Sequence, residues 1–210
     1  MTSTDATVTK TDIELIAESL PGSTDYRTYR EMVSKLVSEK ATTGSEQTET
    51  LIDYTKLNDR RMARWDKTFK LPKEAEELVK KLDKKVLWLV LTESWCGDAA
   101  HAMPIMNKLA ELSPNLEFRA ILRDENLELM NRFLTNGTLS IPKLIAVDQE
   151  AGEILYTWGP RPSVATKLVS DYKKEHDRLT PEFKQELQLW YNKDKGQNIL
   201  EDLLELLALK

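Results

Sequence analysis

The residues from Val86 to Leu91 constrain the fold of this chain more than any other segment. All six are apolar, so neither face of the segment is suited to water. A strand that is apolar on both faces is typical of the centre of a sheet covered by helices on each side. The run is also far shorter than the roughly 20 residues that a membrane-spanning helix needs. We therefore expect a buried central strand in a layered protein.

The segments after this strand alternate between strand and helix, which is typical of an α/β fold. A turn at 94–97 is followed by a helix that runs to about residue 112. We expect further strands at 116–122, 143–147 and 154–158, and further helices at 126–134 and 163–175. The polar link at 148–153 fits a hairpin turn, so the last two strands are predicted to be antiparallel.

Both ends of the chain are predicted to be helical. Thr11 and Glu14 fit a capping box, Pro21-Gly22 ends the first helix, and a second helix begins at Tyr26. The helix after Gly44 is expected to face the core with Leu51, Tyr54, Leu57, Met62 and Trp65. Thr180-Pro181 begins a late helix, and a final helix covers about 198–209. We divide the chain into a helical extension at 1–71, a domain at 72–175, and C-terminal helices at 176–210 packed on it.

The charge and the cysteine content exclude several classes of function. The net charge is −5, and acidic and basic residues are mixed along the chain, which argues against a nucleic-acid or anionic-membrane partner. The start, Met1 to Ala6, lacks the basic and apolar stretches of a secretory signal, so we expect a cytoplasmic protein. The single cysteine excludes an internal disulfide and a multi-cysteine zinc site, and we expect neither metal nor cofactor.

The junction between the central strand and the next helix reads Trp95-Cys96-Gly97-Asp98-Ala99-Ala100. It resembles the Trp-Cys-Gly-Pro-Cys-Lys motif of thioredoxins, and Pro104 falls where that family has a helix-kinking proline. Ser140-Ile141-Pro142-Lys143 resembles the family's strand start, whose proline follows a cis peptide bond and faces the cysteine. Gly159 also matches a family glycine. The resemblance covers about residues 72–175 and implies a thioredoxin-like fold, with a central mixed sheet of about four strands flanked by helices and extra helices at both ends.

Two further segments, Tyr54 to Met62 and Thr92 to Asp98, are similar to a bacterial branch of thioredoxin-like proteins with a helical N-terminal extension. In the dithiol mechanism a thiolate attacks a disulfide and a second cysteine resolves the mixed disulfide. The resemblance places Cys96 at the attacking position and Ala99 at the resolving position, which is therefore vacant. It also places Val90 and Ala120 where thioredoxins have a buried aspartate and a nearby lysine.

The local charges predict the acidity of the cysteine. The start of a helix favours a thiolate at Cys96, and the carboxylate of Asp98 opposes it by a similar amount. We therefore expect a thiol pKa only slightly below that of free cysteine, between roughly 7 and 8.5. His101 lies five residues further along the helix, which rotates it about 140° away from Cys96, so we expect a solvent-facing or boundary histidine and no base.

Two hypotheses follow for the function. The first is a monothiol thioredoxin-like protein that forms mixed disulfides through Cys96 with a protein or a low-molecular-weight thiol; any enzymatic activity would be thiol-disulfide exchange. The alternative is a non-catalytic module that binds a peptide or protein in a groove formed by Trp95, Gly97, Asp98, Ile141 and Pro142. An iron–sulfur carrier has less support, because the chain has Cys-Gly-Asp-Ala where monothiol glutaredoxins have Cys-Gly-Phe-Ser. A monomer is favoured.

Overall fold

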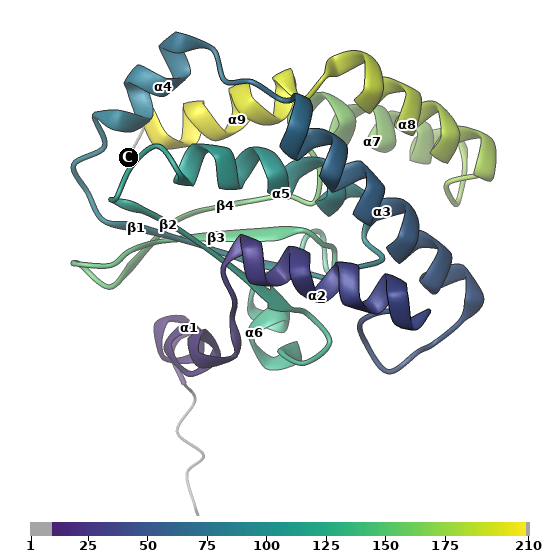
Figure 1. Ribbon diagram of the computed structural model, residues 1–210, viewed down its shortest axis with the longest axis horizontal. Helices are drawn as coiled ribbons and strands as arrows, with labels where there is room; N and C mark the ends of the chain where they lie inside the picture. The colour runs from purple at the N-terminus through teal and green to yellow at the C-terminus, as the bar shows by residue number, and fades with distance from the viewer. Residues whose placement is uncertain (1–9, 209–210) are drawn as a thin grey trace, which may run out of the picture.

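A four-stranded sheet lies at the centre of the computed structural model, which describes residues 10–208 (Figure 1). The strands are β1 (Val86–Thr92), β2 (Leu116–Leu122), β3 (Lys143–Asp148) and β4 (Glu153–Trp158), in the order β2-β1-β3-β4. β1 pairs in parallel with β2 and antiparallel with β3, and β3 pairs antiparallel with β4. The predicted mixed sheet and its closing hairpin are therefore confirmed.

Helices surround this sheet. They are α1 (Asp12–Ser19), α2 (Tyr26–Glu39), α3 (Glu49–Thr68), α4 (Lys73–Lys80), α5 (Gly97–Ala110), α6 (Leu127–Arg132), α7 (Ser163–Glu175), α8 (Pro181–Asp194) and α9 (Gln197–Ala208). A 3₁₀ turn, Leu20–Gly22, follows α1. The segment Met1 to Ala6, from which we expected no secretory signal, lies outside the described residues. The same holds for Leu209 at the end of the predicted last helix.

Helices cover both faces of the sheet (Figure 1). α5 and α9 lie on one face and pack against each other, with α4 and α7 packed on α9. α1 and α6 pack together on the other side, and α2 packs on β2. The central strand is buried along its whole length, as its composition requires. None of the helices within residues 10–208 is long and apolar enough to cross a membrane.

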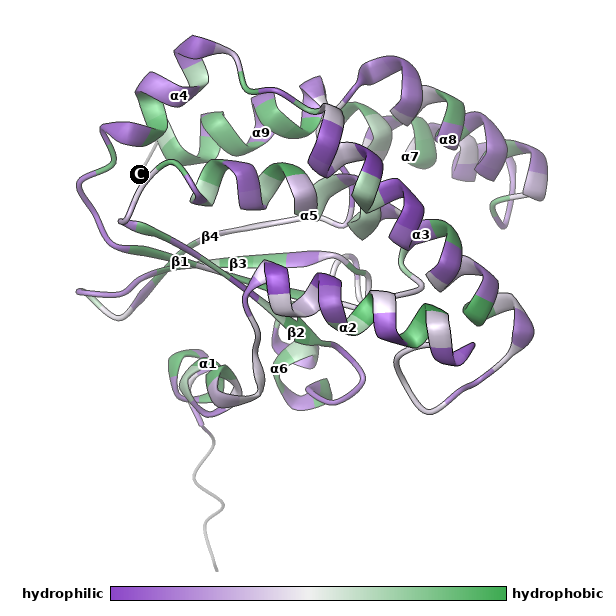
Figure 2. Ribbon diagram, in the orientation of Figure 1, coloured by the Kyte–Doolittle hydropathy of each residue, from purple (hydrophilic) through white to green (hydrophobic). Residues whose placement is uncertain are grey.

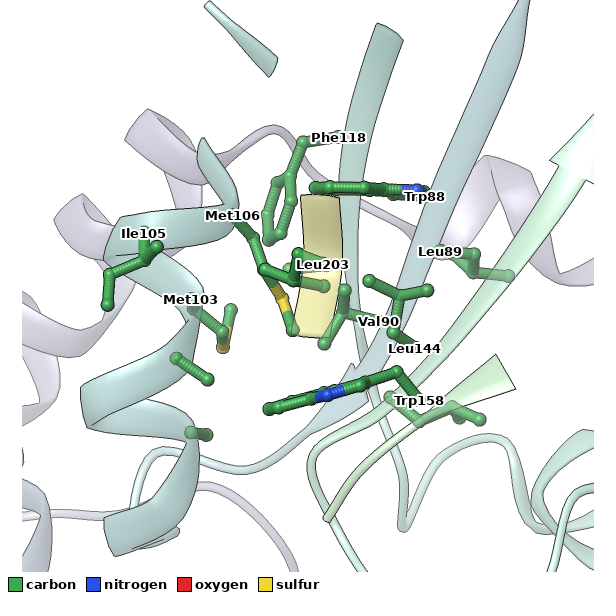
Figure 3. Close-up of a cluster of buried hydrophobic side chains, with 14 of the residues drawn as sticks. Trp88, Leu89, Val90, Met103, Ile105, Met106, Phe118, Leu144, Trp158 and Leu203 are labelled. Atoms are coloured by element: carbon green, nitrogen blue, oxygen red, sulfur yellow. The ribbon is translucent and has the colours of Figure 1, made fainter. Parts of the chain in front are cut away.

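The core between the sheet and α5 is built from the apolar residues that the sequence singles out. Trp88 and Val90 of β1 lie on the same side as Met103 and Met106 of α5 and Leu203 of α9 (Figure 3). The indole Nε1–H of Trp88 donates a hydrogen bond of 2.9 Å to the hydroxyl of Tyr156, so this buried polar atom is satisfied. The hydropathy colouring shows α9 as largely apolar, whereas α3 carries long polar stretches (Figure 2).

Hydrogen bonds and packing connect the N-terminal helices to this core. Thr11 and Glu14 form the predicted capping box at the start of α1. The backbone of Thr24 forms a pair of hydrogen bonds with Ala120, which attaches the segment after α1 to β2. α3 packs on both α2 and α5. The expected core face of α3 is wrong in part, because Tyr54 and Leu57 are each 41% exposed.

Candidate functional site

The site begins where β1 ends. The chain turns at Glu93–Cys96, with the Cys96 amide donating to the Glu93 carbonyl at 3.0 Å, and α5 then starts at Gly97. Cys96 is the residue that precedes the first helical turn, and its carbonyl accepts from the amide of Ala100. This position is the one at which unpaired helical N–H groups meet a side chain.

The Cys96 thiol is buried against the start of β3. The side chain is 7% exposed, and Sγ–H donates a hydrogen bond of 3.3 Å to the carbonyl oxygen of Ile141. That carbonyl belongs to the Ile141–Pro142 peptide bond, which is cis, the isomer that the resemblance implies. The structure thus brings the cysteine and the Ile-Pro segment into direct contact.

The expected acidity of this thiol is wrong. Burial raises the pKa of Cys96 to about 12, and the Asp98 carboxylate adds to the increase. The backbone amides of Ala99 and Asp98 and the Arg161 guanidinium lower it, but they do not compensate for burial. The sequence shows the helix start and the carboxylate, but it does not show how completely the surrounding helices remove the sulfur from water.

The predicted groove residues surround one cavity of about 440 Å³ beside the thiol. Trp95, Cys96, Gly97, Asp98 and Ile141 all line it, whereas Pro142 is buried and is not part of the lining. The lining also includes residues that were not predicted to form the groove: Leu51, Tyr54, Arg123, Leu139, Ser140, Pro160, Arg161 and Lys184. The Arg123 guanidinium lies 5.0 Å from the centre of the Trp95 ring, a cation–π distance.

Apolar side chains occupy the three positions that the resemblance assigns to the resolving half of a dithiol site. Ala99 is 2% exposed, and Val90 and Ala120 face each other across the parallel β1–β2 pair, fully or almost fully buried. A buried acid does occur nearby, because Glu93 is 1% exposed. Its Oε1 accepts from the Asp124 amide at 2.9 Å, and its Oε2 has no hydrogen-bond partner among the described residues. Burial raises the pKa of this carboxyl.

Asp98 has a different environment from the solvated helix start that the sequence suggested. Its Oδ2 pairs with Nη2 of Arg161 at 2.8 Å, and its Oδ1 accepts from the hydroxyl of Tyr191 at 2.9 Å. The side chain is only 12% exposed. Burial raises the pKa of Asp98, and Arg161 and Tyr191 oppose that increase. Asp98 therefore joins α5 to α8 and to the segment before α7.

His101 is buried, with 1% exposure, so the predicted solvent-facing or boundary position is wrong. Nε1–H of Trp65 donates to its Nδ1 at 3.0 Å, so Nε2 carries the proton and donates to Oε1 of Gln188 at 3.1 Å. The ring also stacks on Tyr191, with centroids 4.3 Å apart. Burial lowers the pKa of His101 to about 4. This histidine links α3, α5 and α8 and does not reach the thiol.

A buried cluster of hydroxyl groups holds the turn before Cys96. The Ser94 hydroxyl lies 2.8 Å from that of Thr55 and 3.1 Å from those of Thr42 and Thr43. Nδ2 of Asn58 donates to the Ser94 carbonyl at 3.0 Å. Thr55 and Asn58 thus occupy the buried side of α3 in place of the expected apolar residues, because Ser94 offers them partners.

The described residues contain no group of three or more histidine, cysteine or acidic side chains arranged to hold a metal ion. The site consists of a buried thiol, a neighbouring carboxylate paired with an arginine, and a groove with aromatic and cationic walls. Chemically, such a site can bind an extended or charged ligand, whereas thiolate chemistry requires the sulfur to lose its proton first.

Comparison with known proteins agrees with this architecture. A protein of unknown function from Pseudomonas aeruginosa is 17% identical, with a TM-score of 0.64 over 91% of this chain and 96% of that chain. An HIV 4E10 epitope scaffold is also 17% identical, with a TM-score of 0.63 over 92% of this chain and 98% of that chain. These likenesses show the fold alone. A search of curated proteins finds no match.

The family assignment comes from sequence. A family model described as thioredoxin matches residues 44–174, which is more than half of the chain. The match includes α3, the turn with Cys96 and the Ile141–Pro142 segment. The chain therefore belongs to the thioredoxin family.

Proposed function

We propose that this protein is a non-catalytic binding module of the thioredoxin family, which holds its partner in the groove beside Cys96 without forming a covalent bond. The observation that carries the proposal is the state of the thiol. Its Sγ–H donates a hydrogen bond to the carbonyl oxygen of Ile141, and burial raises the pKa of the thiol to about 12, so the protonated thiol is favoured at neutral pH. A groove with Trp95 and Ile141 in its lining remains available for binding.

The missing resolving group supports the same proposal. An internal resolving thiol is absent at Ala99, and β1 and β2 have apolar Val90 and Ala120 where the family resemblance implies a proton-transfer pair. A chain with these substitutions keeps the shape of the site and loses the means to complete a dithiol cycle. Cys96 is a free thiol, and free thiols are typical of reducing compartments, so we propose that the protein lies in the cytoplasm.

The second candidate is the monothiol function, in which Cys96 forms mixed disulfides. One observation favours it: Cys96 itself lines the groove, so a disulfide bound there would lie beside the sulfur. In that reaction the Cys96 thiolate attacks a disulfide, one partner sulfur becomes bonded to Cys96, and the other leaves as a thiolate. The reaction needs the thiolate that burial disfavours.

Native-state alkylation separates the two functions. Protein purified without reductant is treated with iodoacetamide at neutral pH, folded and in urea, and modification of Cys96 is followed by mass spectrometry. The binding module predicts slow alkylation in the folded state, rapid alkylation in urea, and no small-thiol adduct on the purified protein. A thiol adduct, or folded-state alkylation as fast as that of free cysteine, would establish the monothiol function instead. The Cys96→Ser variant is the blank.

A further inference from the structure

A second cavity, of about 570 Å³, adjoins the groove beside Cys96. The two share Tyr54, Gly97, Asp98, Arg161 and Lys184 in their linings, so they lie side by side. The remaining walls come from Arg61 of α3, from Leu179 and from residues of α8, which include Leu187 and Gln188. α3 and α8, which precede and follow the sheet in the sequence, therefore build this cavity together with the start of α5.

The charges around this cavity are mainly positive. Arg61, Arg161 and Lys184 line it, with Asp98 as the acidic side chain. Asp98 is already paired with Arg161. Within residues 10–208, no carboxylate lies at ion-pair distance from Arg61 or Lys184. The protein as a whole carries a net charge of −5, so a cavity lined by more cations than anions is a local exception.

Arg61 is placed where a bound anion would stabilise it further. The guanidinium lies over the first turn of α5, since a Cβ built on Gly97 would be 3.3 Å from Nη1. Nη1 donates to Asn58 Oδ1 at 3.0 Å, which is a neutral partner. Partial burial lowers the pKa of Arg61 and Arg64 adds to the decrease, whereas Tyr54 and the Asp98 carboxylate oppose it. A partly desolvated cation at the positive end of a helix dipole is stabilised by a bound anion.

The remaining walls of the cavity are apolar, which indicates that the ligand also has an apolar part. Leu179, Pro181 and Leu187 line the same cavity, beside the ring of Tyr54. A small inorganic ion would leave these walls without a partner, whereas the carbon skeleton of an organic ligand would cover them. We propose that this cavity binds the carboxylate group of an organic ligand between Arg61, Arg161 and Lys184. The inference specifies the ligand of the groove and so rests on the proposed binding function.

Titration of the full chain followed by NMR tests this proposal. The probes are glutarate and a short glutamate-containing peptide, with glutaramide and a glutamine peptide as their uncharged counterparts. Inorganic phosphate is the control for a small ion and should bind more weakly than either organic anion. We expect the amide signals of Gly97 and Asp98 to shift saturably with at least one of the two organic anions and not with the uncharged probes. Tighter binding of the peptide than of glutarate would identify a peptide side chain as the source, and the reverse would identify a free organic acid.

Charge reversal on α8 supplies the matched comparison. Lys184 and Lys193 are both exposed residues of this helix, but only Lys184 lines the cavity. Lys184→Glu should weaken binding at least about tenfold, whereas Lys193→Glu should leave it within about twofold. Arg61→Gln should weaken it as well. Absence of saturable binding by both organic anions, or equal losses in the two lysine variants, would overturn the proposal.

The anion titration and the alkylation experiment can fail independently, so failure of the cavity proposal can be told apart from failure of the proposed binding function. Anion binding together with a reactive Cys96 would remove the non-covalent function and leave the anion cavity in place. An inert Cys96 without anion binding would remove the cavity proposal and leave the binding module.

Discussion

Asp98 is the charged side chain with the largest effect on the Cys96 thiol. Its carboxylate is second only to burial among the causes that raise the pKa of Cys96. Asp98→Asn removes the charge and keeps an oxygen that can accept from the Tyr191 hydroxyl, so the variant should fold and its thiol pKa should fall. We expect iodoacetamide alkylation of the folded protein to become severalfold faster between about pH 8 and 10.

Arg161 offers a control of opposite sign, because its guanidinium lowers the pKa of Cys96. Arg161→Gln should slow alkylation or leave it undetectable. If Asp98→Asn slowed alkylation instead, the carboxylate would be acting through the packing of α8 and not through its charge.

His101 makes stability depend on pH. Its folded-state pKa is lowered to about 4 from an ordinary value of 6.5, so the unfolded chain binds its proton more readily. The free energy of unfolding should therefore fall as pH decreases from about 6.5 to about 4, by roughly 3 kcal/mol in full, and should change no further on this account below that range. Urea unfolding at neutral pH and near pH 5 measures the effect.

His101→Gln removes the titrating ring and should reduce this pH dependence, even if the variant is less stable at every pH. The chain has a second histidine, the exposed His176, and His176→Gln is the matched control. An unchanged difference between the two pH values in the His101 variant would show that other groups cause the loss of stability.

At the scale of elements, the end of β4 is fitted closely to the segment that contacts Cys96. Gly159 has φ +110°, and a Cβ built on it would lie 2.1 Å from the carbonyl oxygen of Pro142. Gly159→Ala must therefore displace backbone, and we expect a loss of at least roughly 2 kcal/mol in the free energy of unfolding. Gly152→Ala, in the hairpin turn, adds a Cβ at φ +66° with nothing within 4 Å.

In the Gly152→Ala variant, only the strain of the backbone conformation should lower the free energy of unfolding, by about 1 kcal/mol. Chemical denaturation of the two variants compares them. Equal losses would mean that the β3 start can move away from Gly159, and the contact between Ile141 and the thiol would then be less constrained than its geometry indicates.

The elements themselves could be predicted because their causes are local. The apolar run of β1, the capping box of Thr11 and Glu14, and the Thr180-Pro181 helix start each act within a few residues. The buried face of α3 could be predicted only in part. Thr55 and Asn58 are buried because Ser94, more than 30 residues away, offers them partners, while Tyr54 and Leu57 lie at exposed positions. Periodicity shows which residues are apolar and cannot show which polar residues find a partner.

The candidate site, like the buried face of α3, could be predicted only in part. The resemblance implies that Pro142 faces Cys96, and the structure shows the thiol in contact with the carbonyl oxygen of the preceding residue, Ile141. His101 and the pKa of Cys96 were predicted wrongly, because both depend on burial by helices distant in the sequence. The partners of His101 come from α3 and α8, 36 and 87 residues away. No pattern around residue 101 indicates them.

For the whole molecule, the N-terminal helices are expected to be necessary for stability. Trp65 forms a hydrogen bond with His101. Thr55 and Asn58 form hydrogen bonds with Ser94, and the backbone of Thr24 pairs with that of Ala120. Deletion of residues 1–70 would leave these buried groups without partners and expose the apolar surface of α5. We expect a protein that aggregates or melts well below the full chain. Thermal unfolding monitored by circular dichroism and light scattering provides the measurement, and an unchanged melting temperature would contradict the prediction.

The cavity between α3 and α8 has a consequence for the order in which the protein becomes functional during synthesis. Its walls come from Tyr54 and Arg61 on one side and from Leu179 to Gln188 on the other, more than a hundred residues later in the chain. A ribosome releases the N-terminal part first, and domains begin to fold as they emerge. The sheet and α3 can therefore assemble while the second wall is still inside the exit tunnel. Only a chain synthesised beyond Gln188 can close this cavity, so a shorter nascent chain cannot compete with the longer one for the proposed ligand.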